Sequence, residues 1–288
     1  NLAVFYKIMG QFDKAEKLYI ESKEIQKNNS GKSHPEYVIS LNNLACLYGD
    51  MGQYERAEPL FIEAKEIRKK ILGENHPDYA TSLNNLATLY QDMGQFKKAE
   101  QLHIEAIEIQ YRILGKKHPD YAMSLNNLAA LYKISGLYKK SEALYIEAKE
   151  TRKNILGENH PDYARSLNNL ATLYEAMGLY KKAEPLFLSS ADIIIKNLKK
   201  TFSILSEKEK ENYLVNNISL MDINNSLLYK YKKGSSSLLI GNYNLIIFFK
   251  SLSLADTRMM LESVNKIKDS TIQNVYKAWQ SNKSLLAK

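Results

Sequence analysis

The stretch HPDYATSLNNLATLYQDMG, residues 76–94, decides the fold of this 288-residue chain. Its apolar residues recur every three or four positions, so they share one face of a helix, and its two asparagines share the other. Pro77 suits the first turn of a helix, where its missing N–H costs nothing, and His76 or Asn75 would cap that turn. Gly94, which tolerates positive φ, would end the helix. We therefore predict an amphipathic helix between Pro77 and Gly94.

The same pattern recurs every 42 residues through the first two thirds of the chain. A second apolar stripe follows each glycine and predicts, in the quoted repeat, a helix from about Phe96 to Leu114 that Gly115 closes. Neither helix can bury its stripe alone, so neighbouring repeats must stack and cover one another. The markers that stay in register are the His-Pro pairs that begin at His34, His76, His118 and His160 and the string SLNNLA that begins at Ser40, Ser82, Ser124 and Ser166.

These repeats predict an all-α chain made of two parts. Residues 1–198 would form a solenoid of helical hairpins, whose first repeat, residues 1–33, is partial because Asn1 matches Asn43 inside a later repeat. Residues 199–288 lack the repeat markers and would form a separate helical module. There a capping box at residues 206–209 predicts one helix start, and further helices are expected from about 242 to 267 and from 269 or 270 onward. The other predicted repeats are residues 34–75, 76–117, 118–159 and 160–198.

The charge of the chain is uneven. Lys and Arg number 40 against 32 Asp and Glu, which gives a formal charge of +8, and residues 189–288 carry most of the surplus. A basic segment with interleaved tyrosines leaves nucleic acid as an alternative partner for this part of the chain. Tyrosine and lysine without a recognised binding fold are a weak signal, so we do not expect nucleic-acid binding. The residues concerned are Tyr229, Lys230, Tyr231, Lys232 and Lys233.

Constellations for catalysis or metal binding are missing from the sequence. Cys46 is the only thiol, which excludes an intramolecular disulfide and a cysteine-based zinc cluster. Four of the five histidines recur at one corner of the repeat, where stacking would separate them by about 10 Å, too far to share a metal; we expect them to cap helices. The longest apolar run, Leu245–Phe249, is far too short to span a bilayer. We expect no catalytic residue, metal, cofactor or membrane segment, and a cytoplasmic protein.

The repeat resembles the tetratricopeptide repeat. Its usual period is 34 residues, and the longer 42-residue unit, with SLNNLA and ILGENHPDYA, is similar to the kinesin light chain type of repeat. The resemblance covers residues 1 to about 198 and implies a right-handed superhelical solenoid whose concave groove binds a peptide or a partner protein. His103 departs from the pattern, because sister repeats place an aromatic ring at its position. The residues that carry the resemblance are Leu86-Ala87, Tyr90, Gly94, Phe96, Ala99 and Ala106.

The polar face of the first helices is the candidate binding surface. In this repeat family the face lines the groove, and an asparagine amide, being both donor and acceptor, can pair with the backbone of an extended peptide. The alternative is a ladder in which each asparagine bonds the adjacent helix, and one residue of each pair can serve each purpose. Flanking positions that vary between repeats suit recognition of one particular ligand, or neutral drift. The candidate groove residues are Asn43, Asn85, Asn127 and Asn169, Asn42, Asn84, Asn126 and Asn168 beside them, and Thr88, Asp92 and Arg165.

The C-terminal part resembles the helical stretch between tetratricopeptide repeats and a caspase-like CHAT protease domain in bacterial proteins. The segments that carry this resemblance lie at residues 202–210, 248–254 and 276–285. It implies that a protease domain with its own His/Cys dyad follows Lys288, that the solenoid regulates this domain, and that the two can contact each other. A plain adaptor or self-assembly module without a protease is the alternative. In either case we expect no enzymatic activity from residues 1–288.

Overall fold

The computed structural model describes residues 2–202, without the side chains of residues 198, 199 and 202, and this part of the chain contains helices and no strand. The all-α fold class is therefore confirmed, and the helical pair predicted for one repeat is found as α5 and α6. The helices are α1 (Leu2–Ile8), α2 (Phe12–Ser30), α3 (Pro35–Asp50), α4 (Tyr54–Leu72), α5 (Pro77–Asp92), α6 (Phe96–Leu114), α7 (Pro119–Ile134), α8 (Tyr138–Leu156), α9 (Pro161–Ala176) and α10 (Tyr180–Phe202).

The chain divides into two compact units, Asn1–Ser190 and Ala191–Lys288. The first unit holds the helical hairpins, and α10 continues past its end to Phe202. Our boundary between residues 198 and 199 stays a prediction. The expected capping box at residues 206–209, and the helices expected after residue 242, lie outside the described residues.

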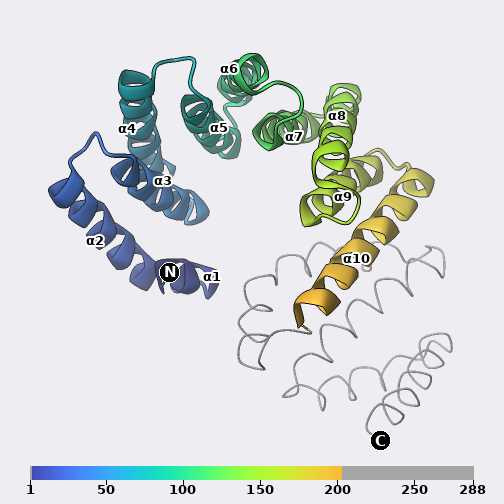
Figure 1. The fold of residues 1–288 in the computed structure, drawn as a ribbon, viewed down its shortest axis with the longest axis horizontal. Coiled ribbons are helices and arrows are strands. Elements are labelled where there is room, and N and C mark those ends of the chain that lie inside the picture. Colours follow the sequence, from blue (N-terminus) through green and yellow to red (C-terminus); the bar gives the residue numbers. More distant parts are fainter. Residues whose placement is uncertain (1, 203–288) are drawn as a thin grey trace, which may run out of the picture. The chain divides into compact units, whose positions relative to one another are not determined.

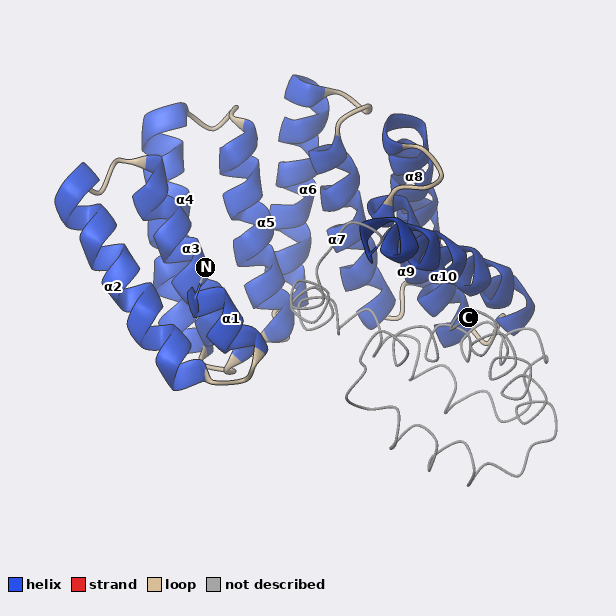
Figure 2. Ribbon diagram, turned by 60° about the horizontal axis from the view of Figure 1, so that its bottom comes forward, coloured by secondary structure: helices blue, strands red, loops and turns tan. Residues whose placement is uncertain are grey.

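Helices of the first unit follow one another as antiparallel hairpins (Figure 2). Figure 1 shows the odd-numbered helices α3, α5, α7 and α9 on the inner side of an arc and the even-numbered helices α2, α4, α6 and α8 on its outer side. From α1 to α9 each helix packs against the next along the chain, and α5 also contacts both α3 and α7. Side chains between odd-numbered helices therefore link one repeat to the next on the inner side of this unit, which we call the inner face.

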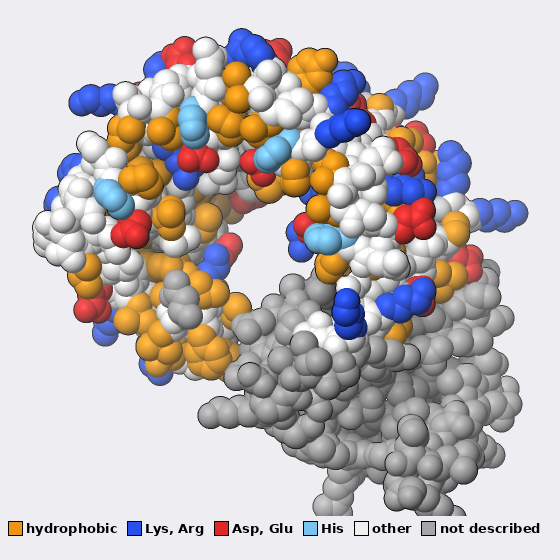
Figure 3. Space-filling view, in the orientation of Figure 1, with side chains coloured by type: hydrophobic (Ala, Val, Ile, Leu, Met, Phe, Trp, Pro, Cys, Tyr) orange, Lys and Arg blue, Asp and Glu red, His pale blue; other side chains and the backbone are white. Residues whose placement is uncertain are grey.

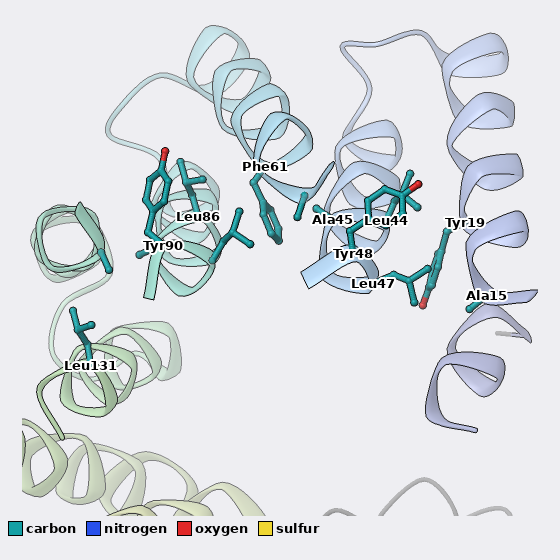
Figure 4. Packing of buried hydrophobic residues seen from close by; sticks show 14 of the residues in the cluster. Ala15, Tyr19, Leu44, Ala45, Leu47, Tyr48, Phe61, Leu86, Tyr90 and Leu131 are labelled. Carbon is teal, nitrogen blue, oxygen red and sulfur yellow. The ribbon is translucent and has the colours of Figure 1, made fainter. Parts of the chain in front are cut away.

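The core lies within each hairpin and also where the second helix of one repeat meets the first helix of the next. Figure 4 shows Tyr19 of α2 beside Leu44 and Leu47 of α3, and Phe61 of α4 pointing toward α5. All four side chains are buried, and burying an apolar side chain of this size stabilises the fold by about 1.5–3 kcal/mol. Alanines fill the positions where backbones approach, and Ala99 of α6 has no exposed surface.

Histidines begin the inner helices, as the sequence predicted. The Nδ1 atom of His76 accepts a hydrogen bond from the backbone N–H of Asp78 at 3.1 Å, which satisfies one of the unpaired donors of the first turn. Gly94 has a φ of 73°, a conformation that costs other residues energy, and it turns the chain from α5 into α6. The same histidine cap recurs at His34, His118 and His160.

A tyrosine–glutamate contact ties each repeat to the one before it. The Tyr90 hydroxyl of α5 donates to Glu58 Oε1 of α4 at 2.8 Å, and Lys98 Nζ lies 4.9 Å from the centre of the same ring. Burial and the Glu58 carboxylate raise the pKa of Tyr90 to about 12, so the phenol keeps its proton and stays a donor. Equivalent pairs are Tyr48–Glu16, Tyr132–Glu100 and Tyr174–Glu142.

The close approach at Ala99 yields a stability prediction. Ala99→Leu should lower the free energy of unfolding by about 1–3 kcal/mol, because the added atoms overpack a contact that has no exposed surface. Urea titration followed by circular dichroism measures the change. Ala143→Leu is the matched control, because Ala143 is an exposed residue of α8 and leucine is also a good helix former. Equal effects of the two substitutions would contradict the packing described here.

Candidate functional site

The two asparagines of each repeat lie in different surroundings. The first asparagine is buried in three repeats, at Asn42, Asn84 and Asn168, and half-buried at Asn126. The second is more accessible: Asn43 is exposed, and Asn85, Asn127 and Asn169 are half-buried. Adjacent positions on a helix point about 100° apart, so one amide is turned toward the neighbouring helices and the other toward the surface of the inner face.

Hydrogen bonds between asparagines cross from one repeat to the next in two places. Asn85 Nδ2 donates to Asn42 Oδ1 at 3.5 Å, which joins α5 to α3, and Asn169 Nδ2 donates to Asn126 Oδ1 at 2.7 Å, which joins α9 to α7. In each case the second asparagine of one repeat is the donor and the first asparagine of the preceding repeat is the acceptor. Within residues 2–202 the Oδ1 atoms of Asn85 and Asn169 bind no protein donor, so each keeps an acceptor for other groups.

The expected third cross-link, from Asn127 to Asn84, is replaced by a buried polar network. His103 Nδ1 of α6 lies 2.8 Å from Asn84 Oδ1, and Asn84 Nδ2 donates to Ser124 Oγ of α7 at 2.5 Å. Ser124 Oγ in turn donates to Gln110 Oε1 of α6. All four side chains are buried. Because Asn84 already bonds His103 and Ser124, Asn127 makes no side-chain hydrogen bond with residues 2–202.

The histidine in this network is neutral. Its Nδ1 atom carries the proton, because the Asn84 oxygen beside it is an acceptor, and its Nε2 atom is buried without a partner among the described residues. Burial lowers the pKa of His103 to about 4, since a protonated ring would lose its hydration. The aromatic residues at this position in sister repeats are Phe61, Tyr145 and Phe187, so this packing position is more polar in the third repeat.

Sequence reasoning missed the partner of the serine that opens each SLNNLA string. In two repeats an arginine of the outer helix donates to it: Arg68 Nη1 to Ser82 Oγ at 3.0 Å, and Arg152 Nη1 to Ser166 Oγ at 2.8 Å. In the third repeat Gln110 occupies the arginine position and accepts from Ser124. The replacement of Arg by Gln is visible in the aligned repeats, but only the structure shows which residue it faces.

The remaining candidate groove residues lie near the asparagines. Thr88 Oγ1 donates to the backbone carbonyl of Asn84 one turn earlier, at 3.0 Å. Asp92 is exposed at the C-terminal end of α5. Arg165 lies one turn before Asn169 and pairs with Asp162 of its own helix, Nη1 to Oδ1, at 2.9 Å. These side chains add a hydroxyl, a carboxylate and a guanidinium group beside the repeated amides.

The described residues offer no centre for metal binding and no membrane span. Within residues 2–202 no three histidine, cysteine, aspartate or glutamate side chains come together to hold a metal ion. In the same part of the chain no helix is both long enough and apolar enough to cross a bilayer.

A stack of helical hairpins with a 42-residue period, each covering the next, defines a helical-repeat solenoid. The family model described as tetratricopeptide repeat matches residues 1–61, 47–112, 83–141 and 120–196, so the chain belongs to the tetratricopeptide repeat family. The repeats of this family are protein–protein interaction scaffolds, a class without catalytic activity of its own. The chain therefore contains a scaffold of this kind. A comparison with curated proteins found no match.

Solved structures give the same fold. A variant form of the nearly identical repeats assigned to a kinesin light chain of Podosopora anserina is 28% identical, with a TM-score of 0.55, over 69% of this chain and 93% of that one. A second structure of these repeats is 29% identical, with a TM-score of 0.53, over 68% and 93% of the two chains. BtubC (BKLC) from P. vanneervenii is 27% identical, with a TM-score of 0.55, over 71% and 80%. The similarity to kinesin light chain repeats is thus confirmed.

The buried histidine yields a prediction about pH. Folded His103 binds a proton only near pH 4, whereas the unfolded ring does so near pH 6.5. Its contribution to stability is therefore complete above about pH 6.5 and falls as the pH drops toward 4, by roughly 3 kcal/mol in total. His103→Phe should remove this part of the acid sensitivity. Urea titrations at pH 7 and pH 4 measure the difference.

A control for this prediction is Tyr145→Phe, which changes the same packing position one repeat later and does not titrate between pH 4 and pH 7. This variant should lose as much stability on acidification as the unaltered protein does. A His103→Phe protein with undiminished acid sensitivity would show that the histidine is not held neutral by burial.

Proposed function

We propose that the repeat unit binds an extended peptide segment of a partner protein along its inner face, with the second asparagines as contacts to the peptide backbone. The observation that supports this most directly is a difference within each pair. The second asparagine is the more accessible one and keeps hydrogen-bonding atoms without a protein partner in residues 2–202: the whole amide at Asn43 and Asn127, and the Oδ1 atom at Asn85 and Asn169. The contacting residues are Asn43, Asn85, Asn127 and Asn169.

The spacing of these amides suits a peptide in extended conformation. Neighbouring packed helices lie about 8–10 Å apart, and an extended chain advances about 3.3 Å per residue. One amide per repeat would then meet the peptide about every third residue, always at its backbone. Such contacts provide affinity with little dependence on sequence, and the flanking side chains, which include Thr88, Asp92 and Arg165, would select among peptides.

The space-filling view is compatible with access to this face. In Figure 3 the first unit is hollowed on the side of its odd-numbered helices, and acidic, basic and apolar side chains all border the hollow. Asn43 and Asn127 make no side-chain hydrogen bond with residues 2–202, so a peptide would not have to break an existing contact there. Peptide binding at these two amides would therefore leave no protein group without its hydrogen-bond partner, a loss that would otherwise cost free energy.

The resemblance of the C-terminal residues to the segment before a CHAT protease domain supports a wider hypothesis. In a larger protein of that type, peptide capture by the repeats would regulate a downstream protease, which would contact the solenoid in the same molecule. A plain adaptor, or a module that assembles with itself, is the alternative. Sequencing the gene beyond Lys288 separates these hypotheses, because only the first requires a His/Cys dyad there.

The peptide-binding proposal predicts opposite effects for two sets of asparagines. Peptides selected from a random library on the full chain serve as ligands. The double variant Asn43→Ala, Asn127→Ala should weaken their binding by about 1 kcal/mol per lost contact, roughly fivefold each, and leave the melting temperature nearly unchanged. Asn84→Ala should instead lower the melting temperature, because it leaves His103 and Ser124 without their partner.

Calorimetry and thermal unfolding of the same preparations provide both readouts. Library selection that yields no peptide, or selected peptides whose affinity is indifferent to Asn43 and Asn127, would exclude backbone recognition by these amides. A double variant that melts well below the unaltered protein would show that the second asparagines serve the fold instead.

A further inference from the structure

An ion pair crosses the inner face at the N-terminal end of the repeat unit. Lys7 Nζ of α1 lies 2.6 Å from Asp50 Oδ2 of α3, and both side chains are partly exposed. The two residues belong to consecutive repeats and are 43 positions apart, the same offset as in the asparagine cross-links. The same pair of positions therefore recurs between every two inner helices, and its occupants can be compared from repeat to repeat.

One repeat further on, the acidic residue of the pair is present and the basic residue is absent. Asp92 of α5 corresponds to Asp50, but the position of Lys7 is taken by Gly49, which has no side chain. Within residues 2–202 Asp92 forms no ion pair. Partial desolvation at this otherwise exposed position, and then the nearby charge of Asp50, raise the pKa of Asp92, as expected for a carboxylate without a compensating cation. A cation supplied from outside would relieve both effects.

Between α7 and α9 the basic residue of the pair is present and the acidic residue is absent. Lys133 corresponds to Lys7, but the position of its aspartate is taken by Ala176 of α9. Burial lowers the pKa of Lys133, and the attraction of Glu175 offsets only part of that effect. No carboxylate of residues 2–202 lies within ion-pair distance of its amine. The intervening pair of positions, Gln91 and Ile134, carries no charge.

We propose that the inner face selects a peptide that carries one basic and one acidic side chain about five or six residues apart, the basic one at Asp92 and the acidic one at Lys133. This inference rests on the proposed function and adds a sequence preference to it. The Lys7–Asp50 pair shows that the Asp92 position faces α3 and the Lys133 position faces α9. The two charges are therefore separated by two helix spacings, roughly 16–20 Å, a distance that about five or six residues of extended chain span.

Two charges of opposite sign also fix the direction of the peptide. The asparagine contacts alone accept a chain running either way, since an amide pairs with N–H and C=O groups alike. With the basic residue held at α5 and the acidic residue at α7, a peptide in which Lys precedes Glu and one in which Glu precedes Lys must run in opposite directions across the same helices. The two directions are not equivalent, because the flanking side chains of the inner face differ from helix to helix.

The test is a charge exchange measured with synthetic peptides and the full chain. Fluorescent peptides of one neutral extended sequence carry Lys and Glu about five residues apart in either order, or Gln at both positions, and fluorescence anisotropy gives their affinities. One of the charged peptides should bind more tightly than the Gln peptide. Asp92→Asn and Lys133→Gln should each weaken that peptide by about fivefold, the effect of a partly exposed ion pair, without affecting the Gln peptide.

The double variant Asp92→Lys, Lys133→Glu should then prefer the charged peptide that the unaltered protein disfavours. Glu108→Gln, at an exposed position of the outer helix α6, is the matched control and should change none of the affinities. Binding of all three peptides with equal affinity would overturn this inference while leaving the peptide-binding proposal intact. Failure of every peptide to bind, including those selected from the library, would overturn both.

Discussion

Coverage of one hairpin by the next is the constraint on which the whole repeat unit depends. The apolar stripe of α4, which includes Phe61, is buried between α3 of its own repeat and α5 of the next, and the same arrangement recurs along the chain. Short-range features serve this arrangement. Proline and histidine fix where each inner helix begins, alanines let the backbones come close, and tyrosine–glutamate hydrogen bonds join each repeat to the one before it. A change in any of them acts on the interface between repeats more than on one helix.

The helices were predictable because their signals are local. The periodicity between Pro77 and Gly94, and the stripe from Phe96 to Leu114, depend on neighbours three or four residues away, and the structure places α5 and α6 there. The roles of Asn84 and Asn85 were not predictable. Both lie on the polar side of the helix, and which of them is buried depends on contacts with residues about 20 to 40 positions distant, His103 and Ser124 among them. A single sequence names the candidates for such contacts and does not choose between them.

The asparagine amides of the inner face recur in every repeat, whereas its charged residues differ from repeat to repeat. Asparagine recurs because the second asparagine of one repeat can bond the first asparagine of the preceding repeat. This gives the hydrogen bonds from Asn85 to Asn42 and from Asn169 to Asn126, each across 43 positions. Charges at the Lys7–Asp50 positions follow no such rule, and the surface between α3 and α9 is consequently acidic at one point and basic at another. Regular architecture with irregular decoration is what allows members of one repeat family to recognise different ligands.

The network of His103, Asn84, Ser124 and Gln110 divides an otherwise uniform array. Units that interact only with their nearest neighbours separate first at the joint with the weakest cohesion, and here one joint holds polar groups and an unpaired imidazole nitrogen where the others hold an aromatic ring. Under tension along the backbone, the array should behave as two short blocks that part near its middle. Each block would keep its own hairpins and its own buried contacts.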